Sequence, residues 1–243
     1  MPVFRLTDDL VFPPPELAEE GGILAIGGDL SEDRLLLAYK MGIFPWSSER
    51  DPLLWWSPDP RLVLFPEDIR VTRSLRQEIN RKTFTITMDT AFESVITQCA
   101  SVHSKADDDT WITSDMIKAY INLHHSGYAH SVEAWQENNL VGGLYGIALG
   151  KAFFGESMFT IKSNASKVAF VYMSEQLSRW GFTIIDCQIT TEHLMSLGAR
   201  EISRKTFLLY LRSALKSQTK KGKWVLELDN PFSGISLSCK AQQ

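Results

Sequence analysis

Between residues 128 and 188, three apolar segments separated by short turns are followed by a helical pattern and a fourth apolar segment. The first three, YAHSVEAWQ, LVGGLYGIAL and AFFGESMFT, are joined by turns short enough for hairpins, so we expect an antiparallel meander. The helical pattern begins after SNAS, ends at Gly181 and leads to the strand FTIIDCQ, which therefore returns through a helical crossover. This plan predicts an α+β domain in which the strand after the helix splays from its neighbour and opens a ligand cleft.

The first 60 residues have a different pattern and predict a separate, small α/β domain. Proline and glycine clusters surround one helical pattern from Ser31 to Met41, which ends at Gly42. The prolines of LLWWSPDPR interrupt regular structure, so we assign residues 1–60 to an N-terminal domain and residues 61–243 to a larger domain.

The rest of the larger domain alternates helices and strands. Before the meander we expect a helix at VTRSLRQEIN, a strand at FTITMD, a short helix from Phe92 to Cys99 and a helix after Ser114. Near the end we expect a helix at TFLLYLRSAL, followed by a polar tail without a clear pattern.

Charge is distributed unevenly along the chain. The formal net charge is −4, which on its own argues against a nucleic-acid partner. Residues 1–60 hold four Lys and Arg against 11 Asp and Glu, a net charge of −7, so the remainder carries +3. Two stretches, residues 70–82 and 200–223, are locally basic. Each is either a solvated helix face or a contact for an anionic partner.

Several classes of protein and site are disfavoured. No apolar run approaches the roughly 20 residues that cross a bilayer, and MPVFRLTDDL lacks the pattern of a secretory signal, so we expect no membrane partner and a cytoplasmic location. The three cysteines and five histidines form neither a disulfide framework nor a metal-ligand spacing, so no metal site is expected. The GxSxG, Walker and GxGxxG motifs are also missing from the sequence.

Polar residues in two apolar strands are candidates for chemistry. In TIIDCQ, Asp186 and Gln188 share one face by strand alternation, while Ile185 and Cys187 share the other. Glu156 lies in the neighbouring strand of the predicted meander, in FFGESMF. A carboxylate in an apolar strand is either hydrogen-bonded in the core or exposed at a cleft, and we favour the cleft.

The plan of meander and crossover resembles the GNAT acyltransferase fold, and the motifs resemble one family in particular. GGILAIGGDLS, LLLAYKMGIFPW, LLWWSPDPRLVL, DTWITSDM, LVGGLYG, FFGESMF, NASK and IIDCQ occur in the order found in leucyl/phenylalanyl-tRNA–protein transferases. The resemblance runs from about residue 12 to residue 211, and GIFPW, WWSPDPR and GESMF are highly specific. It implies a small N-terminal α/β domain followed by a GNAT-like acyltransferase domain.

The resemblance also implies an activity. Enzymes of this family move Leu, Phe or, less often, Met from an aminoacyl-tRNA to the N-terminal Arg or Lys of a protein, which marks that protein for degradation. They need neither a metal nor another cofactor. The acidic N-terminal portion would meet the cationic acceptor, and a basic patch would meet the tRNA.

Residue roles are implied by the matching motif positions. Asp186 and Gln188 match the catalytic pair, and Glu156 matches an acid that helps to hold the aminoacyl-adenosine end. The other implied contacts are the adenosine-facing Trp46 and Trp111, the side-chain pocket of Leu144, Met158, Phe170, Met173, Leu177 and Ile185, and the tRNA patch of Arg73, Arg76, Arg81 and Lys82.

Two other functions remain open on the residues alone. An acetyl-CoA-dependent GNAT enzyme would hold pyrophosphate on a glycine-bearing turn, but the corresponding turn here reads KSNASK. A tRNA-binding module without catalysis would not need Asp186, Gln188 and Glu156.

Overall fold

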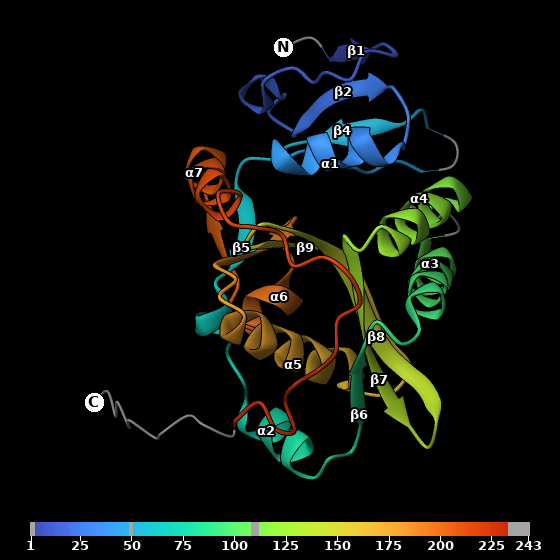
Figure 1. Cartoon of the computed structure of the whole chain (residues 1–243), viewed down its shortest axis with the longest axis vertical. Helices are drawn as coiled ribbons and strands as arrows, with labels where there is room; N and C mark the ends of the chain where they lie inside the picture. The colour runs from blue at the N-terminus through green and yellow to red at the C-terminus, as the bar shows by residue number, and fades with distance from the viewer. Residues whose placement is uncertain (1–2, 49–50, 108–111, 233–243) are drawn as a thin grey trace.

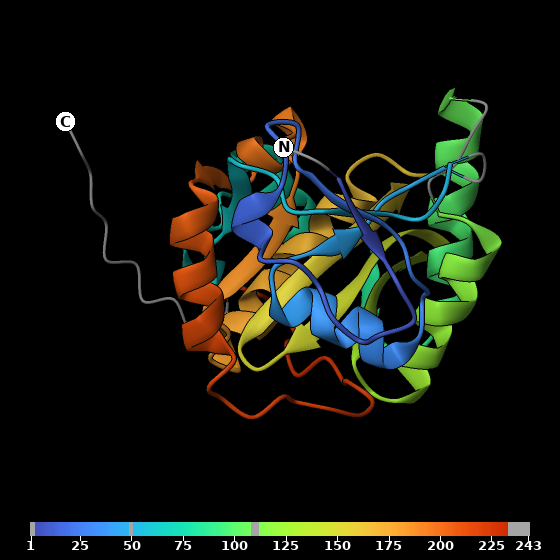
Figure 2. The same cartoon turned by 90° about the horizontal axis from the view of Figure 1, so that it is seen from above.

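The computed structural model describes residues 3–48, 51–107 and 112–232. The strands form two β-sheets, a small one near the N-terminus and a large one built from the rest of the chain (Figure 1). Seen from above, the N-terminal part lies across the end of the large sheet, between α7 on one side and α3 and α4 on the other (Figure 2).

The N-terminal sheet has four short strands in the order β1-β2-β4-β3. Its strands are β1 (Phe4–Leu6), β2 (Ile23–Gly27), β3 (Phe44–Pro45) and β4 (Leu54–Trp56), and it carries the 3-10 helix η1 (Pro15–Leu17) and helix α1 (Glu32–Lys40). Helix α1 begins where the sequence predicts, because the Ser31 hydroxyl accepts a hydrogen bond from the Arg34 backbone N–H. It is followed by Gly42 at φ +73°, a left-handed backbone that favours glycine.

The large sheet has seven strands in the order β11-β5-β10-β9-β8-β7-β6. These strands are β5 (Arg61–Leu64), β6 (Thr85–Met88), β7 (Ala129–Gln136), β8 (Asn139–Leu149), β9 (Ala152–Thr160), β10 (Ile184–Gln188) and β11 (Arg200–Ile202). Strands β7, β8 and β9 pair antiparallel, and β10 pairs parallel with β9 after the crossover helix α5 (Ala165–Arg179). The predicted meander and strand–helix–strand unit are therefore confirmed, and with them the α+β class.

Helices cover both faces of the large sheet (Figure 1). Helix α5 packs on β7 and β8 from one side, and α3 (Phe92–Asp107) and α4 (Ser114–His125) pack from the other. The remaining helices are η2 (Pro66–Asp68), α2 (Arg73–Asn80), α6 (Glu192–Ser196) and α7 (Arg204–Ala214). Helix α3 extends well past its predicted end at Cys99, since the polar run that follows has no apolar stripe to reveal it.

The two sheets share one hydrophobic cluster. Buried side chains of the N-terminal part, such as Tyr39, Phe44 and Trp55, belong to the same cluster as Phe154 and Phe207 of the larger part. The division into two domains at residue 60 stays a prediction, because this shared core joins both sides of it.

Residues 216–232, here called the C-terminal strap, run back from α7 across the molecule to α2 (Figure 1). The strap is held by Trp224, which is 1% exposed and stacks on the His130 ring with 3.6 Å between ring centroids. The Trp224 backbone N–H donates to the Asp89 carboxylate, which also contacts His130 Nδ1. The predicted polar tail is thus a structured segment as far as Phe232.

In the part of the chain that the structure describes, every helix is too short or too polar to cross a membrane.

Candidate active site

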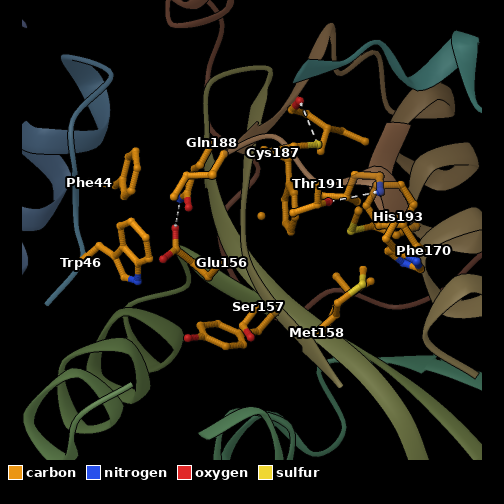
Figure 3. Close-up of a pocket in the computed structure, with 18 of the residues that line it drawn as sticks. Phe44, Trp46, Glu156, Ser157, Met158, Phe170, Cys187, Gln188, Thr191 and His193 are labelled. Carbon is orange, nitrogen blue, oxygen red and sulfur yellow. Dashed lines mark hydrogen bonds between the residues drawn. The ribbon is translucent and has the colours of Figure 1, made fainter. Parts of the chain in front are cut away.

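A cavity of about 410 Å³ lies between the N-terminal part and the large sheet. Phe44, Pro45 and Trp46 of the segment around β3 border it on one side. Its other walls are mostly apolar side chains of β8, β9, α5 and β10, namely Leu144, Tyr145, Phe153, Met158, Phe170, Met173 and Ile185. Met158 and Phe170 are labelled in Figure 3. The cavity is suited to an apolar group, with polar atoms confined to a few positions.

Glu156 is the buried acid of this cavity. Its Oε1 accepts hydrogen bonds from the Tyr39 hydroxyl and from the Gln188 side-chain amide, each at 2.8 Å, and its Oε2 accepts one from the Tyr120 hydroxyl at 2.8 Å. Burial raises the pKa of Glu156 to about 7, although these three hydrogen bonds act in the opposite direction. The carboxyl group can therefore change its protonation state near neutral pH.

Two β-bulges, one on β9 and one on β10, set the directions in which the Glu156 and Gln188 side chains point. On β9, Gly155 pairs with Gly146 and Ser157 pairs with Tyr145, which leaves Glu156 as the extra residue. On β10, Asp186 and Gln188 pair with consecutive residues of β5, which leaves Cys187 as the extra residue. An extra residue shifts the alternation of side chains by one position.

The bulge on β10 separates two residues that the sequence places on one face. Gln188 lines the cavity together with Ile185 and Cys187, whereas Asp186 is fully buried outside the cavity lining. Asp186 instead accepts two hydrogen bonds from the Arg61 guanidinium, at 2.8 and 2.7 Å, and one from the Gln188 backbone N–H at 3.0 Å. The expectation of a shared face is wrong, because Gln188 has φ +62° and does not continue the strand geometry.

Most of the predicted substrate-contact residues come together at the cavity. Those that line it are Trp46, Leu144, Glu156, Met158, Phe170, Met173 and Ile185, and Gln188 of the predicted catalytic pair lines it as well. Leu177 is buried in α5, four residues after Met173, and lies outside the cavity lining. Trp111 lies outside the described residues.

Other residues of the site escaped the sequence interpretation. Phe44 and Arg61 lie inside the motifs GIFPW and WWSPDPR, where the prolines and tryptophans drew attention first. Tyr39 and Tyr120 sit in helical patterns that read as ordinary core. Their hydroxyls donate to Glu156, and this role becomes visible only when the fold shows that the buried acid lies next to them.

The four predicted tRNA-contact residues are exposed and gather on α2 and at its C-terminal end. Two of them contact the end of the C-terminal strap. The Arg76 guanidinium lies 4.1 Å from the Phe232 ring centroid, and the Lys82 ammonium lies 3.0 Å from the Asp229 carboxylate. Arg73 and Arg81 complete the group, which we call the α2 basic patch.

Comparison with known proteins places these features in a family. A family model described as leucyl/phenylalanyl-tRNA protein transferase matches residues 63–212, and a model of that protein's N-terminal domain matches residues 28–59. A leucyl/phenylalanyl-tRNA–protein transferase from Syntrophobacter fumaroxidans is 60% identical over 87% of this chain and 90% of its own length. One from Myxococcus xanthus is 53% identical over 92% of this chain and 97% of its own.

The matches among solved structures are more distant. L-PGS from Bacillus licheniformis matches with a TM-score of 0.38 and 11% identity, over 71% of this chain and 57% of that one. A GCN5-related N-acetyltransferase from Kribbella flavida matches with a TM-score of 0.35 and 12% identity, over 69% of this chain and 60% of that one. The sequence matches, in contrast, extend over nearly the whole chain, and this protein belongs to the leucyl/phenylalanyl-tRNA–protein transferase family.

Proposed function

We propose that this chain transfers leucine or phenylalanine, and less often methionine, from aminoacyl-tRNA to the N-terminal Arg or Lys of an acceptor protein. The observation that carries the proposal is an apolar cavity with Glu156 and Gln188 on its wall, in a chain of this family. The product is a protein extended by one residue, which is thereby marked for degradation. The reaction takes place in the cytoplasm.

The apolar part of the cavity receives the side chain of the transferred amino acid. Leu144, Met158, Phe170, Met173 and Ile185 offer it only carbon and sulfur atoms. Leu, Phe and Met gain similar free energy from burial, so discrimination among them is modest. Val and Ile branch at Cβ and require a different shape near the backbone. Trp46 is half-buried and lines the cavity, and its indole ring stacks on the terminal adenosine.

Glu156 and Gln188 act at the reacting atoms. The ester carbonyl of the aminoacyl-tRNA is attacked by the uncharged α-amine of the acceptor, a C–N bond forms, and the C–O bond to the ribose breaks. Among the described contacts, Glu156 Oε2 accepts one hydrogen bond, so it retains a lone pair for the proton of the amine. Glu156 then passes that proton to the departing ribose oxygen. A pKa of about 7 suits a group that both accepts and donates a proton near neutral pH.

Asp186 contributes through Gln188. Its carboxylate is enclosed by the Arg61 guanidinium and the Gln188 backbone N–H, so it does not reach the substrate. Asp186, the other member of the predicted catalytic pair, thus acts as a positioning residue that holds Gln188 in its left-handed conformation. Proximity and orientation of the two substrates supply most of the acceleration, because the ester is already activated.

The two macromolecular substrates meet surfaces of opposite charge. The α2 basic patch contacts phosphates of the tRNA, and acidic side chains of the N-terminal part attract the cationic terminus of the acceptor.

The function is tested by incubating the chain with Phe-tRNA labelled on the amino acid and a protein that begins with Arg. Label in the protein is the expected result. The same protein beginning with Ala is the matched acceptor control, and Val-tRNA is the matched donor control. Absence of transfer with intact substrates contradicts the proposal, and so does tight binding of CoA measured by titration calorimetry.

A further inference from the structure

Arg61 is a buried charge beside the active site. It is the first residue of β5 and is 1% exposed. Its Nε and Nη2 donate to the two carboxylate oxygens of Asp186 at 2.8 and 2.7 Å, and this parallel pair of bonds fixes the direction of the carboxylate as well as its position. The desolvation of two buried charges offsets much of their attraction, so stability alone does not account for this pair.

The guanidinium is itself held by two aromatic rings. Its Cζ lies 4.7 Å from the centroid of Phe44 and 4.6 Å from that of Phe207. Phe44 belongs to β3 in the N-terminal part and lines the cavity, whereas Phe207 belongs to α7. Arg61 is therefore fixed by contacts from three separate parts of the fold.

Asp186 in turn fixes a residue that lines the cavity. Asp186 Oδ1 accepts the backbone N–H of Gln188, whose φ of +62° is uncommon for a residue with a side chain. The Gln188 amide then reaches Glu156 at 2.8 Å. An unbroken series of contacts thus runs from Arg61 through Asp186 and Gln188 to Glu156, and a left-handed residue persists only where its surroundings hold it.

We propose that Arg61 is a positioning residue for the transfer reaction: it orients Asp186, and Asp186 fixes the backbone of Gln188 so that the amide stays at Glu156. This inference rests on the proposed function. Arg61 itself lies outside the cavity lining, so it acts on the reaction through the residues that it holds.

The test replaces Arg61 by lysine, which keeps the charge but cannot form two parallel bonds to one carboxylate. Arg34→Lys is the matched control. Arg34 is also 1% exposed and forms an ion pair with an aspartate, Asp29, at 3.0 Å, but it lies on α1 outside the cavity lining. For Phe transfer we expect Arg61→Lys to lower kcat at least about tenfold with KM for Phe-tRNA within about twofold, and Arg34→Lys to leave both within about twofold.

A double-mutant cycle separates positioning from a general loss of structure. In a Gln188→Ala background the group that Arg61 positions is gone, so Arg61→Lys should change kcat by less than about twofold. Equal effects of Arg61→Lys in both backgrounds would overturn the proposal, as would a kcat unchanged by Arg61→Lys in the parent chain.

Thermal melting establishes whether each variant is folded. If Arg61→Lys does not fold, Phe207→Leu replaces it, because this change loosens the guanidinium and leaves the cavity lining intact. Its expected loss of about threefold in kcat should vanish in the Gln188→Ala background, and persistence of the loss overturns the proposal. Absence of transfer by the parent chain overturns the proposed function and this role with it, whereas an active parent isolates the role of Arg61.

Discussion

The side-chain amide of Gln188 donates a hydrogen bond to the carboxylate of Glu156, with 2.8 Å between Nε2 and Oε1. The two residues come from neighbouring parallel strands; Glu156 is the extra residue of a β-bulge on β9, and Gln188 follows the extra residue of another on β10. Bulges next to active sites commonly redirect side chains. Here they bring a buried acid and an amide to the same cavity wall.

Glu156→Gln should make the pH dependence of stability weaker. Because burial raises the pKa of Glu156 from 4.5 to about 7, the folded chain favours the protonated form. The contribution of protonated Glu156 to the stability of the parent is thus fully present below about pH 4.5 and is lost as pH rises through about 7, a change of about 3 kcal/mol that the variant lacks. Urea unfolding of both proteins between pH 4.5 and 8 measures the difference. Parallel curves would contradict the raised pKa.

The same substitution should abolish most of the transfer activity. Glutamine retains the shape of Glu156 but cannot take the proton of the attacking amine, so kcat should fall about 100-fold or more. Single-turnover transfer from labelled Phe-tRNA measures the step directly. A variant with parental kcat would rule out Glu156 as the proton acceptor.

Met158→Trp should change the preference among donors. Met158 is half-buried and lines the apolar wall, so a larger ring there removes space from the transferred side chain. Transfer of Phe should fall about tenfold more than transfer of Leu, measured as kcat/KM for each aminoacyl-tRNA. Ile161→Trp, at a position that is 57% exposed just after β9, should leave the ratio unchanged. Equal losses of Leu and Phe transfer would show that the side chain binds elsewhere.

Arg73→Ala should weaken tRNA binding and its dependence on salt. If the α2 basic patch contacts phosphates, the slope of log Kd against log salt concentration should drop by about one. Asp229→Ala should act in the opposite direction, since it frees the Lys82 ammonium from its carboxylate partner. Arg5→Ala, at the exposed position of β1 in the N-terminal sheet, is the control. A salt-independent affinity would place the tRNA on another surface.

Trp224→Ala should release the C-terminal strap from the hydrophobic core on which it packs. The side chain is 1% exposed and stacks on His130, so its removal leaves a cavity and should reduce the free energy of unfolding by about 3–5 kcal/mol. Val225→Ala, at the neighbouring position that is 66% exposed, should cost less than about 0.5 kcal/mol. Chemical denaturation compares the two, and similar costs would mean that Trp224 does not anchor the strap.

The part of the large sheet from β7 to β10 follows from patterns within the chain. Alternation, turns and the helical crossover predict β7 to β10, and the N-cap at Ser31 predicts the start of α1. Local patterns act over a few residues, so they indicate these elements without knowledge of their neighbours.

The details of the site depend on contacts between distant residues. Alternation places Asp186 and Gln188 on one face, but the bulge that separates them exists because β10 pairs with β5. Likewise, the partners of Glu156 come from α1, α4 and β10, and a single sequence offers no signal that joins them. The contact between the end of the C-terminal strap and α2 also joins residues that lie far apart in the sequence.

The position of β5 between β10 and β11 has a consequence for synthesis. Arg61 is made early, yet its partner Asp186 follows 125 residues later, and β11 pairs with β5 only after that. Closing so long a loop is slow compared with forming the β7–β9 meander. An emerging chain thus completes its meander before the proposed catalytic residues Asp186 and Gln188 are made, so a polypeptide released before β10 lacks both of them.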